Sequence, residues 1–247
     1  MKLTEGIHLV GSGRAGIGLS DDYDCHVWLV KAGDECALID TGAGRDVPAI
    51  LRAIEADGVD PARVRTILLT HAHADHAGGA AALRARLGAR VCASREAAGQ
   101  VEPADEIATS LQAARAAGAY PEDYTLAPCP VDRVLAPGEV IRLGDATITV
   151  VPASGHSSGH VAYLLASDAG VAAFTGDAVF SGGRVVLQRI WDCSVQESAA
   201  TIERLAALRP DGLYPGHGLF HVRHGYRELD KAMEWVRRLL VPPQLSF

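Results

Sequence analysis

The stretch LLTHAHADH, residues 68–76, places three histidines and an aspartate within six positions, directly after an apolar run. Imidazole nitrogens and carboxylate oxygens are the usual zinc ligands where cysteine is not used. A strand that ends in a turn can direct His71 and His73 to one side, and a helix that starts there can direct Asp75 and His76 to a neighbouring point. A single catalytic zinc normally takes three protein ligands and a water, so four candidate ligands indicate two ions.

Three further fragments with ligand-type side chains follow in the chain. SGHSSGH (154–160) lies between two predicted strands, and FTGD (174–177) and YPGHG (214–218) each end an apolar run. Each fragment contains glycine, which permits close approach of the backbone. A single fragment of this kind is typical of a loop, but the three in this order after residues 68–76 predict that His156, Asp177 and His217 join the metal site.

The order HxHxDH, GHSSGH, FTGD, PGHG resembles the metallo-β-lactamase superfamily, and within it most of all the glyoxalase II-like branch. The resemblance runs from LIDTG at residues 38–42 to His217. It implies an α+β fold, an αββα sandwich of two β-sheets with helices on both outer faces, formed by a single domain over residues 1–247. The chain's own pattern agrees, because strands followed by strand–helix alternation occur twice, which favours two similar halves.

The resemblance also implies a role for each candidate ligand. One metal would be held by His71, His73 and His156, and a second by Asp75, His76 and His217, while Asp177 bridges both. Asp40, the aspartate of LIDTG, would hold a ligand histidine by a hydrogen bond without touching the metal, as such partners fix the ring's tautomer and direction.

Such a site implies a metal-dependent hydrolase with two Zn²⁺ ions, iron and manganese being the other candidate metals. Two neighbouring ions can share a hydroxide that attacks a carbonyl group, here of a thioester, ester, lactone or lactam. Asp75 is the expected catalytic residue, which orients the nucleophile and takes its proton. An alternative in the same branch is a mononuclear iron dioxygenase that acts on a persulfide, and metal analysis would separate the two.

The substrate pocket is predicted from positions at which this sequence departs from related enzymes and from one long connecting segment. The segment Gln100–Pro130 is long for a connection and is expected to form a substrate lid. The expected pocket residues are Tyr120 and Tyr124 of this segment, Phe180, which stands where related lactonases place a tyrosine, and His221. A GCGR-type signature is missing after FTGD and only 30 residues follow His217, so we expect no requirement for glutathione.

Other features have simpler interpretations. His8, His26, His160, His221 and His224 lie outside the ligand set, and a structural or surface role is expected for any one of them. Of these five, His221 is the one expected to reach the pocket. GSGRAG, residues 11–16, spells a dinucleotide-binding pattern, but the glycine, serine and aspartates that follow would break the required helix, so a loop is predicted. Helices are predicted over residues 47–56, 76–87, 104–117 and 198–208, and a last one carries apolar positions from 229 to 240.

Composition excludes several classes of partner. The net charge is −7 and no basic stripe occurs, so a nucleic-acid partner is not expected. No apolar run reaches 18 residues and the N-terminus is too short and polar for a signal peptide, so no membrane association is predicted. Five scattered cysteines indicate reduced thiols, and a cytoplasmic protein with a small-molecule substrate is expected. The sequence gives no indication of oligomeric state.

Overall fold

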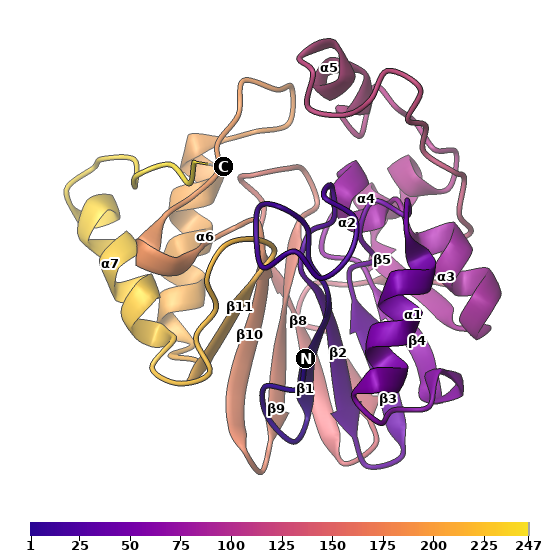
Figure 1. Ribbon diagram of the computed structural model, residues 1–247. Coiled ribbons are helices and arrows are strands. Elements are labelled where there is room, and N and C mark those ends of the chain that lie inside the picture. The colour runs from indigo at the N-terminus through magenta and orange to yellow at the C-terminus, as the bar shows by residue number, and fades with distance from the viewer. Residues whose placement is uncertain (247) are drawn as a thin grey trace. The chain divides into compact units, whose positions relative to one another are not determined.

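The computed structural model describes residues 1–246, which form two compact units, one over Met1–Leu135 and the other from Ala136 onward. Each unit is a β-sheet with helices on it (Figure 1). Among the described residues, no helix is long and apolar enough to cross a membrane. The single domain over residues 1–247 stays a prediction.

The N-terminal unit contains a six-stranded sheet in the order β1-β2-β3-β4-β5-β6. The first three strands are antiparallel, and β3 to β6 run parallel. Strands of parallel sheets are commonly buried on both faces, and in β4 and β5 every residue is buried except Arg65 and Arg90. The strands are β1 (Ile7–Gly11), β2 (Val27–Ala32), β3 (Glu35–Ile39), β4 (Val64–Leu68), β5 (Arg90–Ser94) and β6 (Arg133–Leu135).

Four helices of this unit share one core with its sheet. Ile50 and Ile54, one turn apart on α1, and Leu83 of α3 belong to the same buried cluster as Leu29 and Ile67 of the strands. Burying each such side chain contributes about 1.5–3 kcal/mol. The helices are α1 (Val47–Ala56), α2 (Ala74–Ala77), α3 (Ala80–Leu87), α4 (Arg95–Val101) and α5 (Leu111–Ala116), with a 3₁₀ turn at Pro61–Arg63.

The second unit contains a five-stranded sheet in the order β11-β10-β9-β8-β7, antiparallel except for the parallel pair β10 and β11. Ile202 and Leu205 of α6 and Leu229 of α7 form a buried cluster with Val151 and Leu213 of the sheet. The elements are β7 (Val140–Leu143), β8 (Ala146–Pro152), β9 (Val161–Ser167), β10 (Gly170–Gly176), a 3₁₀ turn at Ser181–Gly183, α6 (Val195–Ala207), β11 (Gly212–Pro215) and α7 (Tyr226–Arg237).

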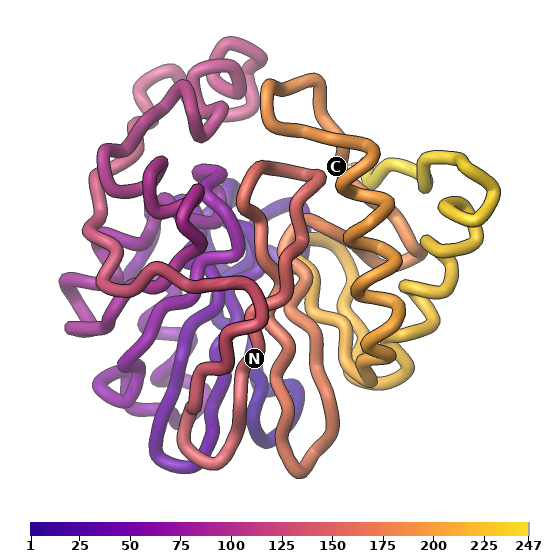
Figure 2. The backbone as a smooth tube through the Cα atoms, turned by 180° about the vertical axis from the view of Figure 1, so that it is seen from behind, coloured from indigo at the N-terminus to yellow at the C-terminus, as the bar shows by residue number. Residues whose placement is uncertain are grey.

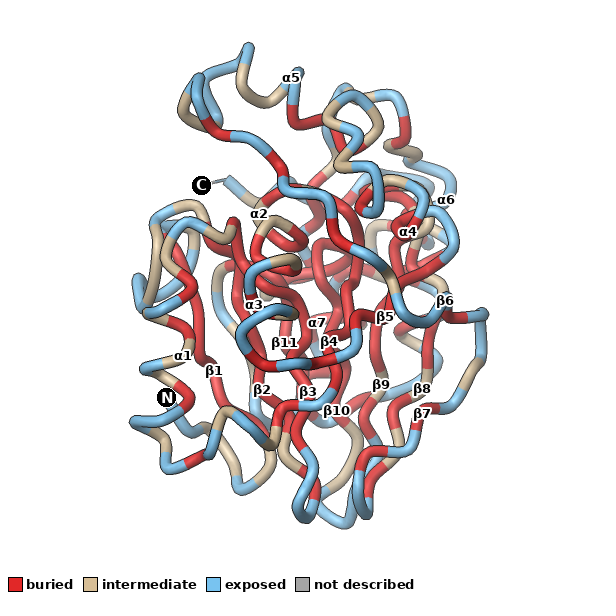
Figure 3. Tube along the Cα trace, turned by 90° about the vertical axis from the view of Figure 1, so that its right-hand side faces the viewer, coloured by how far each residue is buried: buried red, intermediate tan, exposed pale blue. Residues whose placement is uncertain are grey.

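The long connection after β5 differs from the prediction. A helix over 104–117 is wrong, because Ala104 and Ser110 have φ values of 54° and 59°, which no right-handed helix accommodates. Helix α4 ends before Pro103, turns follow, and only Leu111–Ala116 is helical. In Figure 2 this segment runs away from its sheet before it returns to β6, and Figure 3 shows exposed residues along it.

Candidate metal centre

The four clustered candidates of the N-terminal unit lie just beyond the carboxyl end of β4. His71 and His73 are in the extended loop, and Asp75 and His76 are in α2. The predicted helix over 76–87 is interrupted, since Gly78 and Gly79 separate α2 from α3. A side chain at Gly79 would have its Cβ 2.2 Å from the carbonyl oxygen of Thr41. Glycine therefore lets the 41–43 turn press against the end of α2.

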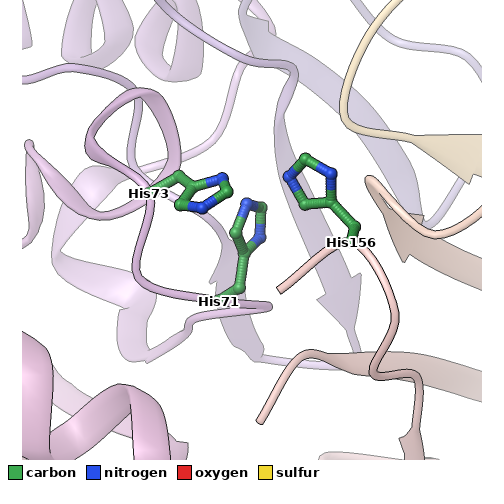
Figure 4. A group of neighbouring side chains, drawn as sticks. All are labelled: His71, His73 and His156. Atoms are coloured by element: carbon green, nitrogen blue, oxygen red, sulfur yellow. The ribbon is translucent and has the colours of Figure 1, made fainter. Parts of the chain in front are cut away.

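Three imidazole rings gather at this loop. The rings of His71 and His73 lie edge to face (Figure 4), and their centroids are 4.7 Å apart. The centroids of His71 and His76 are 4.1 Å apart. The Nε2 atom of His76 is 3.6 Å from Oδ2 of Asp75. Two ligands of one tetrahedral zinc are separated by about 3.3–3.6 Å when each is about 2.0–2.2 Å from the ion. Asp75 and His76 therefore have the spacing of two ligands to one ion.

Asp40 lies behind two of these histidines. One of its carboxylate oxygens, Oδ2, accepts a hydrogen bond of 2.8 Å from Nδ1 of His76, and the Thr70 backbone N–H donates to the other, Oδ1, at 2.8 Å. Asp40 is buried and adopts a positive φ of 61°, a conformation that short polar residues tolerate best. The proton of His76 is thereby held on Nδ1, and Nε2 presents its lone pair.

The tautomer of His71 follows from the same network. The Thr70 hydroxyl donates to Oδ2 of Asp40 at 2.8 Å, because a carboxylate can only accept. That hydroxyl has one hydrogen, so its 2.9 Å contact with Nδ1 of His71 must be a hydrogen bond donated by the ring. His71 therefore also carries its proton on Nδ1, and its Nε2 is an acceptor that can bind a metal.

The thiol of Cys25 lies beside Asp40 and His76, within 4.8 Å of a ligand atom of each. Burial raises the pKa of this thiol to about 12. A thiolate is the form that binds metals, and Asp40 and His76 are already bonded to each other. We therefore assign these three residues to a hydrogen-bonded support and not to a further metal site.

The two predicted pocket tyrosines of the segment after α4 have different partners. Tyr120 donates its hydroxyl to Oδ1 of Asp75 at 3.0 Å, whereas Tyr124 donates to the carbonyl oxygen of Ala43 at 2.7 Å. Burial, and after it the charge of Asp75, raises the pKa of Tyr120 well above its ordinary value, so the phenol keeps its proton. The Tyr124 hydroxyl thus contacts the backbone, whereas the Tyr120 hydroxyl contacts a candidate ligand.

A loop is present where GSGRAG predicted one: residues 12–26 connect β1 to β2, and Asp24 anchors this loop by hydrogen bonds. The Asp24 carboxylate accepts from the Ser20 hydroxyl at 2.5 Å and from the Ala43 N–H at 2.7 Å. Burial raises the pKa of Asp24 to about 6. The loop therefore connects to the same turn that presses against α2.

In the second unit, three candidate ligands follow strand ends. His156 lies between β8 and β9, Asp177 directly follows β10, and His217 follows β11. Because β10 and β11 are parallel, their carboxyl ends meet at one edge, and this brings Asp177 and His217 together. His156, also drawn in Figure 4, donates from Nδ1 to the carbonyl oxygen of Val186 at 2.8 Å, which leaves Nε2 as the acceptor.

One oxygen of Asp177 is shared between the two histidines. Its Oδ2 is 3.6 Å from Nε2 of His156 and 3.6 Å from Nε2 of His217. These are again the separations of ligand pairs, and they are what a carboxylate between two ions requires. The donor types and spacings in both units therefore fit divalent metal.

His160 has a role that the sequence only hinted at. It is buried, and its Nε2 accepts a 3.1 Å hydrogen bond from the Asp177 N–H. The expected structural role is therefore specific, since His160 holds the backbone of a candidate ligand. The sequence signal for it is the second histidine of SGHSSGH.

The other two predicted pocket residues lie near this edge. Phe180 is buried, with its ring centroid 6.4 Å from that of His217. His221 is half-buried, and its Nε2 contacts the Ser181 hydroxyl at 2.9 Å and is 4.0 Å from Oε1 of Glu228. A nucleophile–base–acid triad needs the acid on the opposite nitrogen of the ring, so these three residues do not form one.

A family model described as the metallo-beta-lactamase superfamily matches residues 20–217. The chain belongs to the metallo-β-lactamase superfamily. Similar curated proteins are named hydroxyacylglutathione hydrolase. The protein of Acidiphilium cryptum is 33% identical over 79% of this chain and 63% of its own length. That of Dechloromonas aromatica is 30% identical over 84% and 60%. The predicted glyoxalase II-like branch is confirmed, and the chain spans about three fifths of the length of these relatives.

Solved structures share the fold at low sequence identity. A metallo-β-lactamase of Cronobacter sakazakii with a HARLDQ motif is 23% identical, with a TM-score of 0.73, over 97% of this chain and 96% of that chain. BJP-1 of Bradyrhizobium japonicum, a subclass B3 metallo-β-lactamase, is 23% identical with a TM-score of 0.72, over 97% and 92%. These likenesses confirm the predicted α+β metallo-β-lactamase fold.

Proposed function

We propose that this chain is a metal-dependent hydrolase with a binuclear zinc centre. In this proposal one ion would be held by His71, His73 and His156, the other by Asp75, His76 and His217, and Asp177 would be a ligand of both. The relatives named hydroxyacylglutathione hydrolase support hydrolysis and do not favour the persulfide dioxygenase.

The observation that carries the proposal is the orientation of three histidine rings. His76, His71 and His156 are each held at Nδ1, by Asp40, Thr70 and Val186 respectively. Each ring therefore keeps Nε2 unprotonated, the form that a metal requires. Histidines that only pack against one another would not need to have the same tautomer.

When bound, the two ions would lower the pKa of a water to about 7 and polarise the scissile carbonyl group. The protein's part is to bind and orient. Asp75 is the proposed catalytic residue, because a carboxylate that directs one oxygen to the site can orient the attacking water and take its proton. Asp40 and His160 hold His76 and Asp177 in place without contact with the substrate.

The proposed substrate is a small molecule with an activated acyl group, a thioester, ester, lactone or lactam. The curated relatives make a thioester the first to assay. The stretch GDAVFSGGR at residues 176–184 lacks the GCGR-type signature of the glutathione-dependent relatives. A carrier other than glutathione is therefore proposed, and Phe180, with the aromatic rings of the segment after α4, would favour an apolar acyl group.

Metal analysis of protein purified without chelators tests the centre. About two zinc ions per chain, loss of thioester or lactone hydrolysis on chelation, and its return with added Zn²⁺ are expected. One iron per chain together with oxygen consumption on a persulfide would instead establish the dioxygenase.

A further inference from the structure

We propose that Tyr120 is a positioning residue that links the segment Gln100–Pro130 to the metal centre through the Asp75 carboxylate. The inference rests on the proposed function, because it assigns Asp75 to the second ion. It adds that the conformation of this segment and the affinity for that ion depend on each other.

The Asp75 carboxylate has two oxygens with different surroundings. Oδ1 accepts the 3.0 Å hydrogen bond from the Tyr120 hydroxyl, while Oδ2 is the oxygen 3.6 Å from Nε2 of His76. A carboxylate on a short side chain can rotate about its Cβ–Cγ bond and present either oxygen. The bond from Tyr120 to Oδ1 selects the orientation in which Oδ2 lies at ligand distance from His76.

The Tyr120 ring is itself held by aromatic stacking. Its centroid is 5.6 Å from that of Tyr23 and 5.2 Å from that of Tyr124, with interplanar angles of 28° and 16°. Tyr23 belongs to the loop fastened at Asp24, and Tyr124 is bonded to the carbonyl oxygen of Ala43. The phenol therefore approaches Asp75 from a fixed direction, as a group that orients a ligand should.

The segment around Tyr120 is anchored close to the ligands as well. Leu111 and Tyr124 share a buried cluster with Ala74, which precedes Asp75 in α2. Arg115 of α5 pairs with Glu106 and donates to the carbonyl oxygen of Tyr124 at 2.5 Å. A displacement of α5 would therefore move the Tyr120 hydroxyl away from Asp75.

Thermodynamic linkage makes the coupling reciprocal. Partners that orient a metal ligand typically change metal affinity about 10–100-fold. If the contact of Tyr120 with Asp75 strengthens binding of one ion by such a factor, binding of that ion must favour the conformation of the segment that makes this contact by the same factor. Amides of residues 101–130 should then exchange more slowly once metal is bound.

Tyr120→Phe tests the link, and Tyr124→Phe is the matched control, because both changes remove one hydroxyl and keep the ring stack. Zn²⁺ is titrated into metal-free protein against a competing chelator, and backbone hydrogen exchange of residues 101–130 is followed with and without Zn²⁺. We expect Tyr120→Phe to weaken one of the two binding steps about 10–100-fold and to reduce the metal-induced slowing of exchange. Tyr124→Phe should leave both binding steps within about threefold of wild type.

Two results would overturn the inference. One is wild-type affinity in Tyr120→Phe, and the other is an equal loss in both variants, which would indicate general packing. Exchange in the metal-free proteins separates this inference from the proposed function. If wild type bound no second ion, the binuclear centre would fail, yet faster exchange in metal-free Tyr120→Phe than in wild type would still support the contact. Unchanged exchange would refute it.

Discussion

Asp40→Asn should move the proton of the His76 ring from Nδ1 to Nε2 and should change the fold little. Asparagine tolerates the positive φ at this position, and its Oδ1 can still accept from the Thr70 N–H. Its amide group, however, places donors toward Nδ1 of His76, where the carboxylate accepted. The ring must then turn Nδ1 into the acceptor and carry its proton on Nε2, the proposed ligand atom.

The magnitudes can be worked from these contacts. Loss of the correct tautomer should lower zinc affinity about 10–100-fold, as is usual for partners of ligand histidines. Asp40→Ala instead removes the acceptor of three buried donors, the Thr70 N–H, the Thr70 hydroxyl and the His76 Nδ1–H, at about 1–3 kcal/mol each. Alanine at a positive φ adds about 1–2 kcal/mol. The alanine variant should therefore lose about 4–11 kcal/mol of stability, and the asparagine variant much less.

The assay has a control within the same unit. Asp57, which is half-buried, accepts from Nδ1 of the buried His8 at 2.9 Å; this is another aspartate–histidine pair, but neither residue is a proposed ligand. Zinc affinity, urea unfolding and the ¹⁵N shifts of the histidine rings are measured for Asp40→Asn and Asp57→Asn. Wild-type zinc affinity in Asp40→Asn, or a His76 that keeps its proton on Nδ1, would refute the tautomer argument. An equal loss of affinity in Asp57→Asn would do so too.

Three other outcomes are expected. Asp75→Ala should lower kcat by about three decades or more while circular dichroism stays unchanged, and hydrolysis that survives thorough chelation would contradict the mechanism. Asp24, whose folded pKa of about 6 exceeds its unfolded value of 3.8, binds more protons when folded, so its contribution to stability is present below about pH 4 and is lost as pH rises through 6. In unfolding experiments on Asp24→Asn, the gain in stability over wild type should be larger at pH 8 than at pH 4 by about 2.4 kcal/mol, and an unchanged difference would count against the pKa. In a panel of thioesters, aryl esters, lactones and β-lactams, acyl-glutathione should not be preferred; turnover of it far above all other substrates would reverse that expectation.

The sequence could place the candidate ligands after strands because these positions follow a simple rule of chain geometry. Ligand-type residues after apolar strands lie at sheet edges, and parallel strands bring such ends together, as β10 and β11 do for Asp177 and His217. What failed depends on distant contacts. The Gly78–Gly79 pair is a local signal against an unbroken helix over 76–87, but nothing local shows that the Thr41 carbonyl oxygen approaches Gly79 there. The hydrogen bond from Tyr120 to Asp75 joins residues 45 positions apart, and no periodicity reports it.

The segment Gln100–Pro130 also shows that local sequence patterns do not report contacts with distant residues. Ile107 and Leu111 are four apart, the spacing that predicted an amphipathic helix, yet Ile107 is 70% exposed and Leu111 is buried. The ion pair of Glu106 with Arg115 and the left-handed Ser110 shape this segment as a turn followed by a short helix. Periodicity indicates a helix only where one face has a core to pack against, and here the apolar contact is a small cluster around Leu111 and Tyr124.

The support around the candidate ligands also explains why particular residue types are needed behind them. A buried carboxylate such as Asp40 is tolerated when its oxygens are saturated with donors, and Thr70 and His76 supply them. Valine at position 70 would keep the shape but remove the hydroxyl that links Asp40 to His71. The tautomers of His71 and His76 are thus both set by one aspartate. Packing of these two rings would not require a buried charge at position 40. Metal binding through Nε2 would require it, because both rings must then carry their proton on Nδ1.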